Sequence, residues 1–422
     1  MINIKNTDVF SRLIQPIISM HGSNPYSRIC SEIPDLEWLK IGIMRSLSED
    51  KSGRGFIQNL FYRTQQLIGV GLFFEALKSK RRLSYLKHSL KSLAQSMLST
   101  KHCPDPFSIC KELDSYHIFG GDGHYHSSAT HDEIIDGKKR ATQHFYTNNM
   151  RTRAMTHMTL AEIGDVRKRE HDTRALERQT IHSLRQGAVK GEKVLYVWDR
   201  ACLKFSQWEV WKRNGIYFLS RSKKDLKFTV LNELEYEKED TVNNGVISDQ
   251  MVLTKNGEKV RRVLYYCPFK KKTYSYLTNL SKKIRPGVIA FLYKTRWDIE
   301  KVFDDFKNKM YEKKSWASHS DAKTSQANFL CIAYNLLLLL EDKLKDEDVE
   351  NVKDKNRKLD RMNNFIVNFE IPESAVSSLY RMPQRITQRP FSLFRWIRSF
   401  LTMDAPWGYT IQLLQISYCK LT

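Results

Sequence analysis

The sequence lacks the features of secreted, zinc-ribbon and membrane-spanning proteins. Its seven cysteines are scattered and form no CxxC pair, and its N-terminus has no basic segment followed by an apolar one. Neither a disulfide framework nor a zinc ribbon is therefore indicated, and we expect a reducing intracellular compartment. The longest apolar run, residues 329–340, has only twelve residues and contains Asn335. A membrane-spanning helix needs about 20 apolar residues, so we predict a buried helix there.

Acidic residues are also few relative to basic ones. The chain of 422 residues has 47 Asp and Glu against 69 Lys and Arg, which gives a formal net charge of +22. Such an excess favours a polyanionic partner, either a nucleic acid or an acidic membrane surface, over a generically basic protein without one. Membrane binding would need an amphipathic anchor as well, and the sequence indicates none. We therefore expect a nucleic acid partner, no membrane, and a cytoplasmic, nucleoid-associated location.

The sequence pattern changes along the chain. Residues 1–110 have apolar positions three and four apart, which predicts helices, and basic side chains crowd residues 78–91. We interpret this part as a helical DNA-binding region, although a solvated helix face explains the charges nearly as well. Residues 111–342 mix helical stretches with apolar runs such as KVLYVWDRA and GIYFLSR, which are typical of strands buried in an α/β sheet.

A β-rich segment interrupts this α/β part. Residues 222–285 show strand and hairpin patterns with turn signals at Asn244-Gly245 and Asn256-Gly257, which indicates an all-β insertion. After the buried helix, residues 343–422 combine a mixed-charge run with the apolar and basic stretch 385–401. We predict a C-terminal helical region there, for dimerisation or contact with DNA ends, with packing on the core as the alternative for 385–401.

Two aspartates share one sequence context. Asp122, in YHIFGGDGHYH, and Asp199, in KVLYVWDRA, each follow an apolar run, and we expect each to end a buried strand. Functional sites of α/β sheets lie at the carboxyl ends of the strands. Together with Glu300 from a later helix, these carboxylates are suited to hold two hard cations such as Mg²⁺ for phosphoryl transfer. Helix capping by the aspartates and an ion pair for Glu300 are the ordinary alternatives.

Residues 291–310, FLYKTRWDIEKVFDDFKNKM, are predicted to form one amphipathic helix. At about 100° per residue, four polar side chains fall within about 60° of one another on it, namely Tyr293, Arg296, Glu300 and Lys307. Its opposite side is expected to face the core through Trp297, Val302 and Phe306.

This spacing, Tyr-x2-Arg-x3-Glu-x6-Lys, resembles the Y-R-E-K signature of bacterial insertion-sequence transposases of the DDE class, the cut-and-paste group with a β-strand insertion. VLYVWDRA is similar to the strand that bears the second aspartate in that family, and GGDG to the turn that bears the first. Residues 35–61 are also similar to its N-terminal region. The resemblance implies an RNase H-like catalytic core split by the β-insertion, for which the 101 residues from Asp199 to Glu300 leave room.

The resemblance also implies roles for individual residues. Asp122, Asp199 and Glu300 would be the catalytic, metal-binding triad for two Mg²⁺ ions, with Mn²⁺ as a substitute. Tyr293, Arg296 and Lys307 would contact transposon-end DNA near the cleaved phosphate, as their hydrogen-bonding groups suit phosphate oxygens. An ion pair between Arg296 and Glu300 in the absence of DNA is compatible with both roles.

The chain departs from the family pattern in its insertion. Hairpin-forming members use an aromatic there, often Trp, to hold a flipped base, but no Trp lies between residues 212 and 296. Tyr274 and Tyr276 are our candidates for stacking on a base. His124, His126 and His131 follow Asp122 closely, and we expect ordinary packing or exposure for them.

The function expected from the sequence is that of a DNA transposase. It would bind double-stranded terminal inverted repeats, cleave them by Mg²⁺-dependent phosphoryl transfer and join the 3′-hydroxyl ends to target DNA. A homodimer in a paired-end complex is implied by the resemblance alone. A catalytically inactive DNA-binding derivative and a nuclease on the same core are the alternatives.

Overall fold

The computed structural model describes residues 8–29, 32–50, 52–64, 68–99, 105–135, 137–162, 172–200, 203–310, 312, 314–349, 360, 364, 372, 375–381, 394–401 and 405–420. The helices are α1 (Val9–His21), α2 (Asp35–Leu47), α3 (Gly53–Thr64), α4 (Val70–Ala76), α5 (Lys80–Ser99), α6 (Asp172–Glu177), α7 (Ile181–Arg185), α8 (Phe205–Arg213), α9 (Pro286–Thr295), α10 (Asp298–Asn308), α11 (Ser320–Lys345), α13 (Ser378–Arg381), α14 (Phe394–Leu401) and α15 (Trp407–Lys420). The strands are β1 (Tyr116–His126), β2 (Ile134–Ile135), β3 (Lys138–Lys139), β4 (Thr142–Asn149), β5 (Met155–Leu160), β6 (Lys193–Trp198), β7 (Ile216–Arg221), β8 (Phe228–Glu233), β9 (Val246–Thr254), β10 (Lys259–Cys267) and β11 (Lys272–Thr278).

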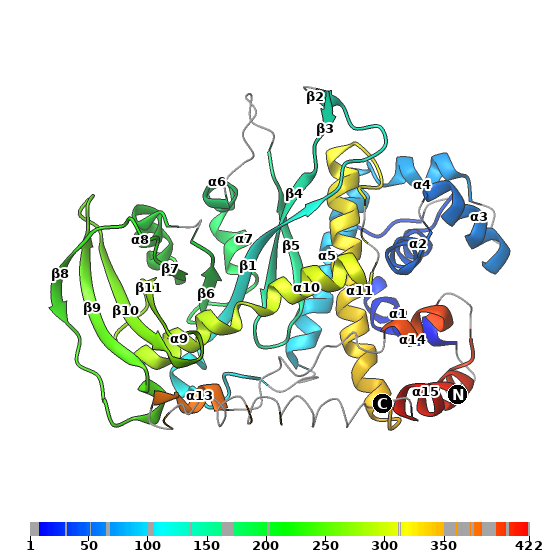
Figure 1. Ribbon diagram of the computed structural model, residues 1–422. Helices are drawn as coiled ribbons and strands as arrows, with labels where there is room; N and C mark the ends of the chain where they lie inside the picture. The colour runs from blue at the N-terminus through cyan, green and yellow to red at the C-terminus, as the bar shows by residue number, and fades with distance from the viewer. Residues whose placement is uncertain are drawn as a thin grey trace.

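A nine-stranded mixed sheet organises the molecule, in the order β5-β4-β1-β6-β7-β11-β10-β9-β8 (Figure 1). β6 pairs in parallel with β1 on one side and β7 on the other, while the remaining neighbours are antiparallel. The mixed α/β fold with helical ends is thus as predicted.

The strands expected in the β-rich segment are present as β8 to β11. They do not form a sheet of their own, because β11 pairs with β7 through Tyr276–Thr278 and so extends the central sheet. β9 and β10 alternate buried and less buried positions over part of their length, and β8, at the sheet edge, is largely exposed. β11 is exposed at its start and buried from Tyr276 to Thr278.

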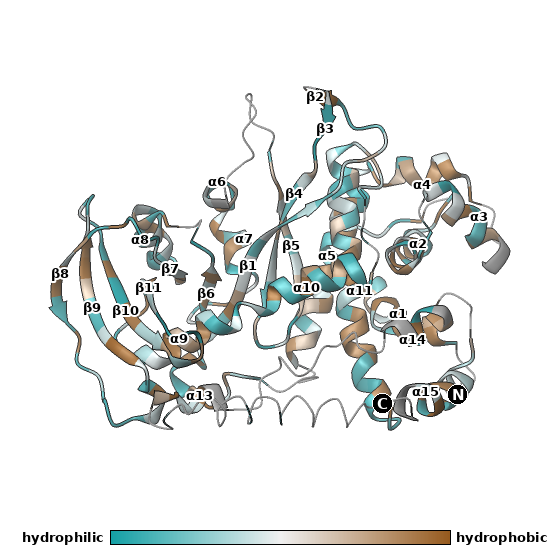
Figure 2. Cartoon of the chain, viewed as in Figure 1, coloured by the Kyte–Doolittle hydropathy of each residue, from teal (hydrophilic) through white to brown (hydrophobic). Residues whose placement is uncertain are grey.

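The long helix α11 forms the centre of the molecule. Its middle, which contains the apolar run 329–340, is buried and lies between the strand β5 and the N-terminal helices α1, α2 and α5 (Figures 1 and 2). Asn335, the polar residue of this run, accepts a hydrogen bond from the Met155 amide and donates one to its carbonyl. The side-chain amide thereby fastens α11 to β5. Within the described part of the chain, no helix is long and apolar enough to cross a membrane.

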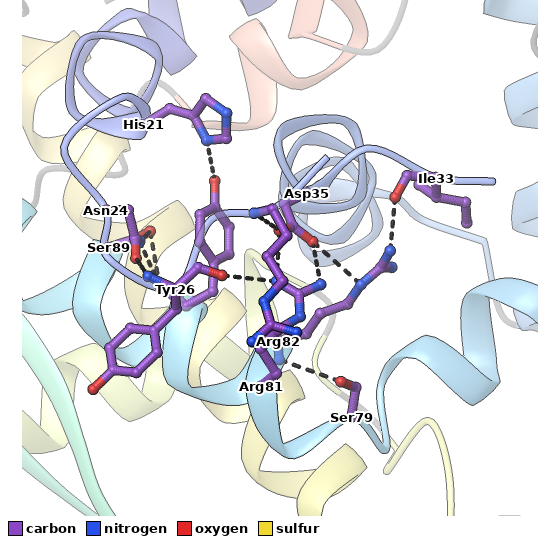
Figure 3. Close-up of polar contacts among 11 residues, drawn as sticks. His21, Asn24, Tyr26, Ile33, Asp35, Ser79, Arg81, Arg82 and Ser89 are labelled. Atoms are coloured by element: carbon purple, nitrogen blue, oxygen red, sulfur yellow. Dashed lines mark hydrogen bonds and ion pairs between the residues drawn. The ribbon is translucent and has the colours of Figure 1, made fainter. Parts of the chain in front are cut away.

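A buried carboxylate holds the N-terminal helices together. Asp35, whose side chain is fully buried, accepts hydrogen bonds from both terminal nitrogens of Arg81 at 2.6 and 2.8 Å, and Arg82 lies 3.4 Å from it (Figure 3). Burial works to raise the pKa of Asp35, but the bonds from Arg81 and from the Arg28 amide outweigh it and lower this pKa. Two of the basic residues considered for DNA binding therefore serve the packing of α5 against α2.

The C-terminal helices pack on the same helical layer. In α14, Ile397 and Leu401 are buried and Arg398 pairs with Glu49 at 2.6 Å. This favours packing over a free DNA-contacting helix for the described part of the stretch 385–401. Residues 382–393 and most of the mixed-charge run 345–361 lie outside the described residues.

We predict that Asp35→Asn lowers the free energy of unfolding by about 3 kcal/mol, because it leaves two guanidinium groups without their buried counter-charge. The measurement is urea unfolding followed by tryptophan fluorescence. The control is Glu37→Gln on the same helix, which removes only a half-exposed pair with Lys40 and should cost less than about 1 kcal/mol. Equal effects of the two substitutions would show that Asp35 does not hold α2 to α5.

Candidate active site

The parallel pairing of β1 with β6 brings the two aspartates side by side. The last paired residues are Gly120 and Val197. Two residues further along each chain stand Asp122 and Asp199, so both occupy the same level of the sheet. The approach is close, because a Cβ at Gly121 would lie 1.8 Å from the Trp198 ring, which is fully buried. Glycine at position 121 is therefore required for this packing.

One expectation about Asp122 is wrong. It does not end a strand, since β1 continues through GGDG to His126. The reason is β4, which pairs with β1 from Phe119 to His126 and keeps it extended beyond the end of β6. Asp122 lies just past the end of the parallel pairing, and Asp199 directly follows β6 as predicted.

The predicted single helix 291–310 is also divided. It consists of α9 and α10, with Arg296 and Trp297 between them. At this break the amides of Trp297 and Ile299 bond to the carbonyls three residues before them, which tightens the turn. Consequently Trp297 does not join the core face with Val302 and Phe306 but is 60% exposed.

Arg296 connects two of the three carboxylates. Its Nη1 lies 3.1 Å from Asp122 Oδ2, and its Nη2 lies 2.8 Å from Glu300 Oε1. The Arg296 side chain is only 5% exposed, whereas the side chains of Asp122 and Glu300 are 24% and 33% exposed. Burial works to lower the pKa of Arg296, but Tyr293 and the three carboxylates outweigh it and raise this pKa. Arg296 is therefore a permanent positive charge between carboxylates that open to solvent.

Tyr293 connects the third carboxylate. Its hydroxyl donates to Asp199 Oδ1 at 3.2 Å, and the Arg200 amide donates to the same oxygen at 2.7 Å. Burial raises the pKa of Tyr293 to about 12, which keeps the hydroxyl protonated and able to donate. On the other strand the Gly123 amide donates to Asp122 Oδ1. Backbone amides thus orient both aspartates.

The donor set fits a hard divalent cation, since it consists of carboxylate oxygens around a position that already holds the positive charge of Arg296. The three carboxylates are not gathered as tightly as metal ligands are. Among the described residues, one group of three ligand side chains has its atoms all within 4.8 Å of one another, and it is a different group. Arg296 stands between Asp122 and Glu300 instead.

A basic hollow of about 230 Å³ lies beside these carboxylates, where β7, β10 and β11 meet. Six cationic residues and no acidic residue line it, namely Arg200, Arg221, Lys223, Lys224, Arg262 and Lys272. Tyr274 also lines it, with the Arg221 guanidinium 5.6 Å from its ring centre. Arg200 follows Asp199 directly, which joins the hollow to the carboxylates.

The other expected DNA contacts have mixed surroundings. Lys307 is exposed, two turns beyond Glu300 on α10. Tyr276 is 4% exposed and packs against Tyr293, with ring centres 5.0 Å apart. The Tyr276 ring therefore has no open face for a base in this structure. The exposed ring of Trp297 has one. The sequence did not indicate it, because the helix break is not visible in the apolar spacing.

His124 and His126 are buried, as expected for ordinary packing, and His131 is exposed. Their surroundings are more specific than packing alone, however. Both buried rings contact the carboxylate of Glu312, a residue that sequence reasoning did not single out.

Together these observations define a mixed α/β fold in which a carboxylate site meets a basic hollow at the ends of the parallel strands. Residues 124–336 match the family described as "Transposase DDE domain". The chain belongs to this transposase family. Membership implies a DNA transposase-type enzyme, and such enzymes generally use divalent metal ions.

Other comparisons add little. Comparison with curated protein sequences finds no match. Among solved structures, the chain is similar to the "piggyBac transposase synaptic complex with hairpin DNA", with 10% identity, a TM-score of 0.33, and coverage of 96% of this chain and 84% of that one.

We predict that Tyr276→Ala lowers the free energy of unfolding by about 3 kcal/mol, because it removes a buried ring from beneath Tyr293. Tyr274→Ala, two residues away and half-exposed, should cost no more than about 1 kcal/mol. Chemical denaturation of the two variants side by side is the measurement. A larger loss for Tyr274 than for Tyr276 would contradict the packing described here.

Proposed function

We propose that the protein is a DNA transposase that binds the terminal inverted repeats of its element, cleaves them by metal-dependent phosphoryl transfer and joins the 3′-hydroxyl ends to target DNA. The observation that carries the proposal is the convergence of three carboxylates, with Asp122 and Glu300 on Arg296 and Asp199 on Tyr293. The hollow beside them is lined by six cationic residues and no acidic one.

In this proposal the three carboxylates hold the divalent cations, Mg²⁺ or Mn²⁺. Bound there, two such cations would activate the attacking oxygen and stabilise the leaving one. The backbone amides of Gly123 and Arg200 keep the aspartates aimed at the site. Arg296 holds the carboxylates together until DNA arrives and then turns to a phosphate oxygen, for which its planar donors are suited.

DNA would lie across the carboxylates and the basic hollow. The phosphates contact the hollow and Lys307, and Tyr293 adds a hydrogen bond near the scissile phosphate. Trp297 and Tyr274 present accessible rings near the site for stacking on a base. The net charge of +22 supports a polyanionic substrate.

The division into regions belongs to the same proposal. Residues 111–342 form the catalytic core, interrupted by the insertion at 222–285. Residues 1–110 contribute to DNA binding with the basic side chains that Asp35 does not engage. Residues 343–422 serve the helical layer and the pairing of two protomers on two DNA ends.

We predict that Asp122→Asn, Asp199→Asn and Glu300→Gln each abolish nicking of DNA that carries the ends flanking the protein's own gene. Each substitution removes one anionic ligand from the cations without changing the shape of the site, and we expect a loss of at least about 100-fold, on the scale of removing a catalytic group. The measurement combines gel-based mapping of cut positions in Mg²⁺ with a mobility-shift assay, which should show retained DNA binding.

Asp304→Asn is the matched control. Asp304 is an exposed acid on the same helix as Glu300, and it accepts a hydrogen bond from Asn308 only within its own helix. It should retain activity. Full nicking by any of the three triad variants would remove that residue from the assignment, and cutting without any joining of 3′ ends would indicate a nuclease rather than a transposase.

We predict that Arg296→Gln raises the affinity of the DNA-free protein for Mn²⁺. The guanidinium competes with a cation for Asp122 and Glu300, and its removal should tighten binding by about tenfold, equivalent to about 1.4 kcal/mol. Electron paramagnetic resonance measures the concentration of unbound Mn²⁺ and so gives the affinity. Mn²⁺ binding that survives in Asp199→Asn is subtracted, because it occurs outside the carboxylate site. Lys301→Gln, which breaks only a pair with Asp298, is the control. Unchanged or weaker Mn²⁺ binding by Arg296→Gln would contradict the bridging role.

A further inference from the structure

A second polar cluster lies buried near Asp122, on the same strand β1. His124 and His126 alternate along β1 and point to the same face of the strand, and Glu312 reaches them from the segment that follows α10. The ligand atoms of these three side chains all lie within 4.8 Å of one another. Glu312 Oε2 is 2.9 Å from His124 Nε2, and Oε1 is 2.7 Å from His126 Nδ1. All three side chains are at most 3% exposed.

The contact between His126 Nδ1 and Glu312 Oε1 is short, at 2.7 Å, but poorly aligned for a hydrogen bond. Among the described residues, neither His126 Nδ1 nor Glu312 Oε1 has a hydrogen-bond partner, even though the two atoms face each other. Buried polar atoms in native proteins are nearly always satisfied, so two poorly satisfied atoms this close together point to a ligand that both of them contact. The ion pairs of Glu312 within the described part of the chain are with the two histidines, and no Lys or Arg balances its charge.

The surroundings of His126 also suit a metal ion. His126 Nε2 lies 2.8 Å from the Tyr146 hydroxyl, which fixes the ring so that Nδ1 faces the cluster, as partners of ligating histidines commonly do. The neighbouring His144, whose ring centre is 4.1 Å from that of His126, is fully buried, and burial lowers its pKa well below the usual value. Its Nε2 has no partner among the described residues, but His144 lies outside the group of ligand atoms within 4.8 Å of one another, so it is a neighbour of the site and not one of its ligands.

We propose that His124, His126 and Glu312 bind a structural Zn²⁺ ion, separate from the divalent cations of the carboxylate site. Two imidazoles and a carboxylate form a donor set that favours zinc, whereas Mg²⁺ prefers oxygen ligands alone. The bonds from zinc to nitrogen and oxygen are about 2 Å long. The ligand atoms of the three side chains, all within 4.8 Å of one another, need only small shifts to reach such distances from one ion.

The position of the site gives the ion a task. β1 carries Asp122 two residues before His124, and Glu312 follows the helix that carries Glu300. His124 also stacks on Phe303 of that helix, with ring centres 4.6 Å apart. A zinc ion here ties β1 to the end of α10 and so holds the two elements that bear Asp122 and Glu300 at a fixed separation.

The test is the metal content of the full-length protein, purified without chelators and with an affinity tag free of histidine. We expect about one zinc per chain by plasma mass spectrometry, and a loss of more than about 90% of it in Glu312→Gln and in His126→Asn. Removing zinc from the unaltered protein with a zinc-selective chelator should lower Tm, and Zn²⁺ but not Mg²⁺ should restore it, with a shift of about 4 °C for saturating metal.

Two controls keep the result interpretable. His117→Asn changes a histidine on the same strand that pairs at the surface with Glu192, and it should retain zinc. Asp199→Asn, in the proposed catalytic triad, should also retain zinc, so the outcome does not depend on DNA cleavage. If a ligand variant does not fold, the chelation and reconstitution of the unaltered protein decide. Folded protein without zinc, whose Tm does not respond to added Zn²⁺, would overturn the proposal and leave a buried contact of Glu312 with the two histidines.

Discussion

The parallel pairing of β1 with β6 is the constraint on which the rest of the site depends. It sets Asp122 and Asp199 at one level of the sheet, and it requires glycine at position 121 to admit the buried Trp198 ring. Antiparallel pairing of β1 with β4 then keeps the strand extended past Asp122 to the two buried histidines. One strand thereby serves two polar sites on a single rigid element.

Charge balance around Arg296 follows from that arrangement. Carboxylates placed this close repel one another, and a buried guanidinium between Asp122 and Glu300 offsets the repulsion. The same charge prevents the carboxylates from closing on each other as a finished metal site would. In this structure the Arg296 guanidinium therefore occupies the region that, under our proposal, divalent cations and a DNA phosphate would share.

Much of the fold was predictable because local patterns determine it. The apolar runs before Gly120 and Asp199, the hairpin at Asn256-Gly257 and the apolar helix at 329–340 are present as expected. Asn244-Gly245 instead follows a 3-10 helix in the longer connection between β8 and β9. The joining of the β-segment to the central sheet was not predictable, since the pairing of β11 with β7 depends on residues far apart in sequence.

The candidate site was predictable in its residues but not in its details. The spacing of Tyr293, Arg296 and Glu300 survives the helix break, because an i,i+4 pair still meets across a tightened turn. The exposure of Trp297 and the burial of Tyr276 depend on that turn and on neighbouring strands, which no periodicity reports. The contacts of Glu312 could not be predicted for a related reason. Its partner His124 lies 188 residues away along the chain.

The most direct test of the central claim is a crystal structure of the protein bound to its end DNA and soaked with Mn²⁺, with anomalous diffraction recorded at the manganese edge. The account predicts anomalous density among Asp122, Asp199 and Glu300, with the Arg296 guanidinium moved from these carboxylates to a DNA phosphate. Manganese bound elsewhere, with Arg296 still joining Asp122 to Glu300 in the presence of DNA, would contradict it.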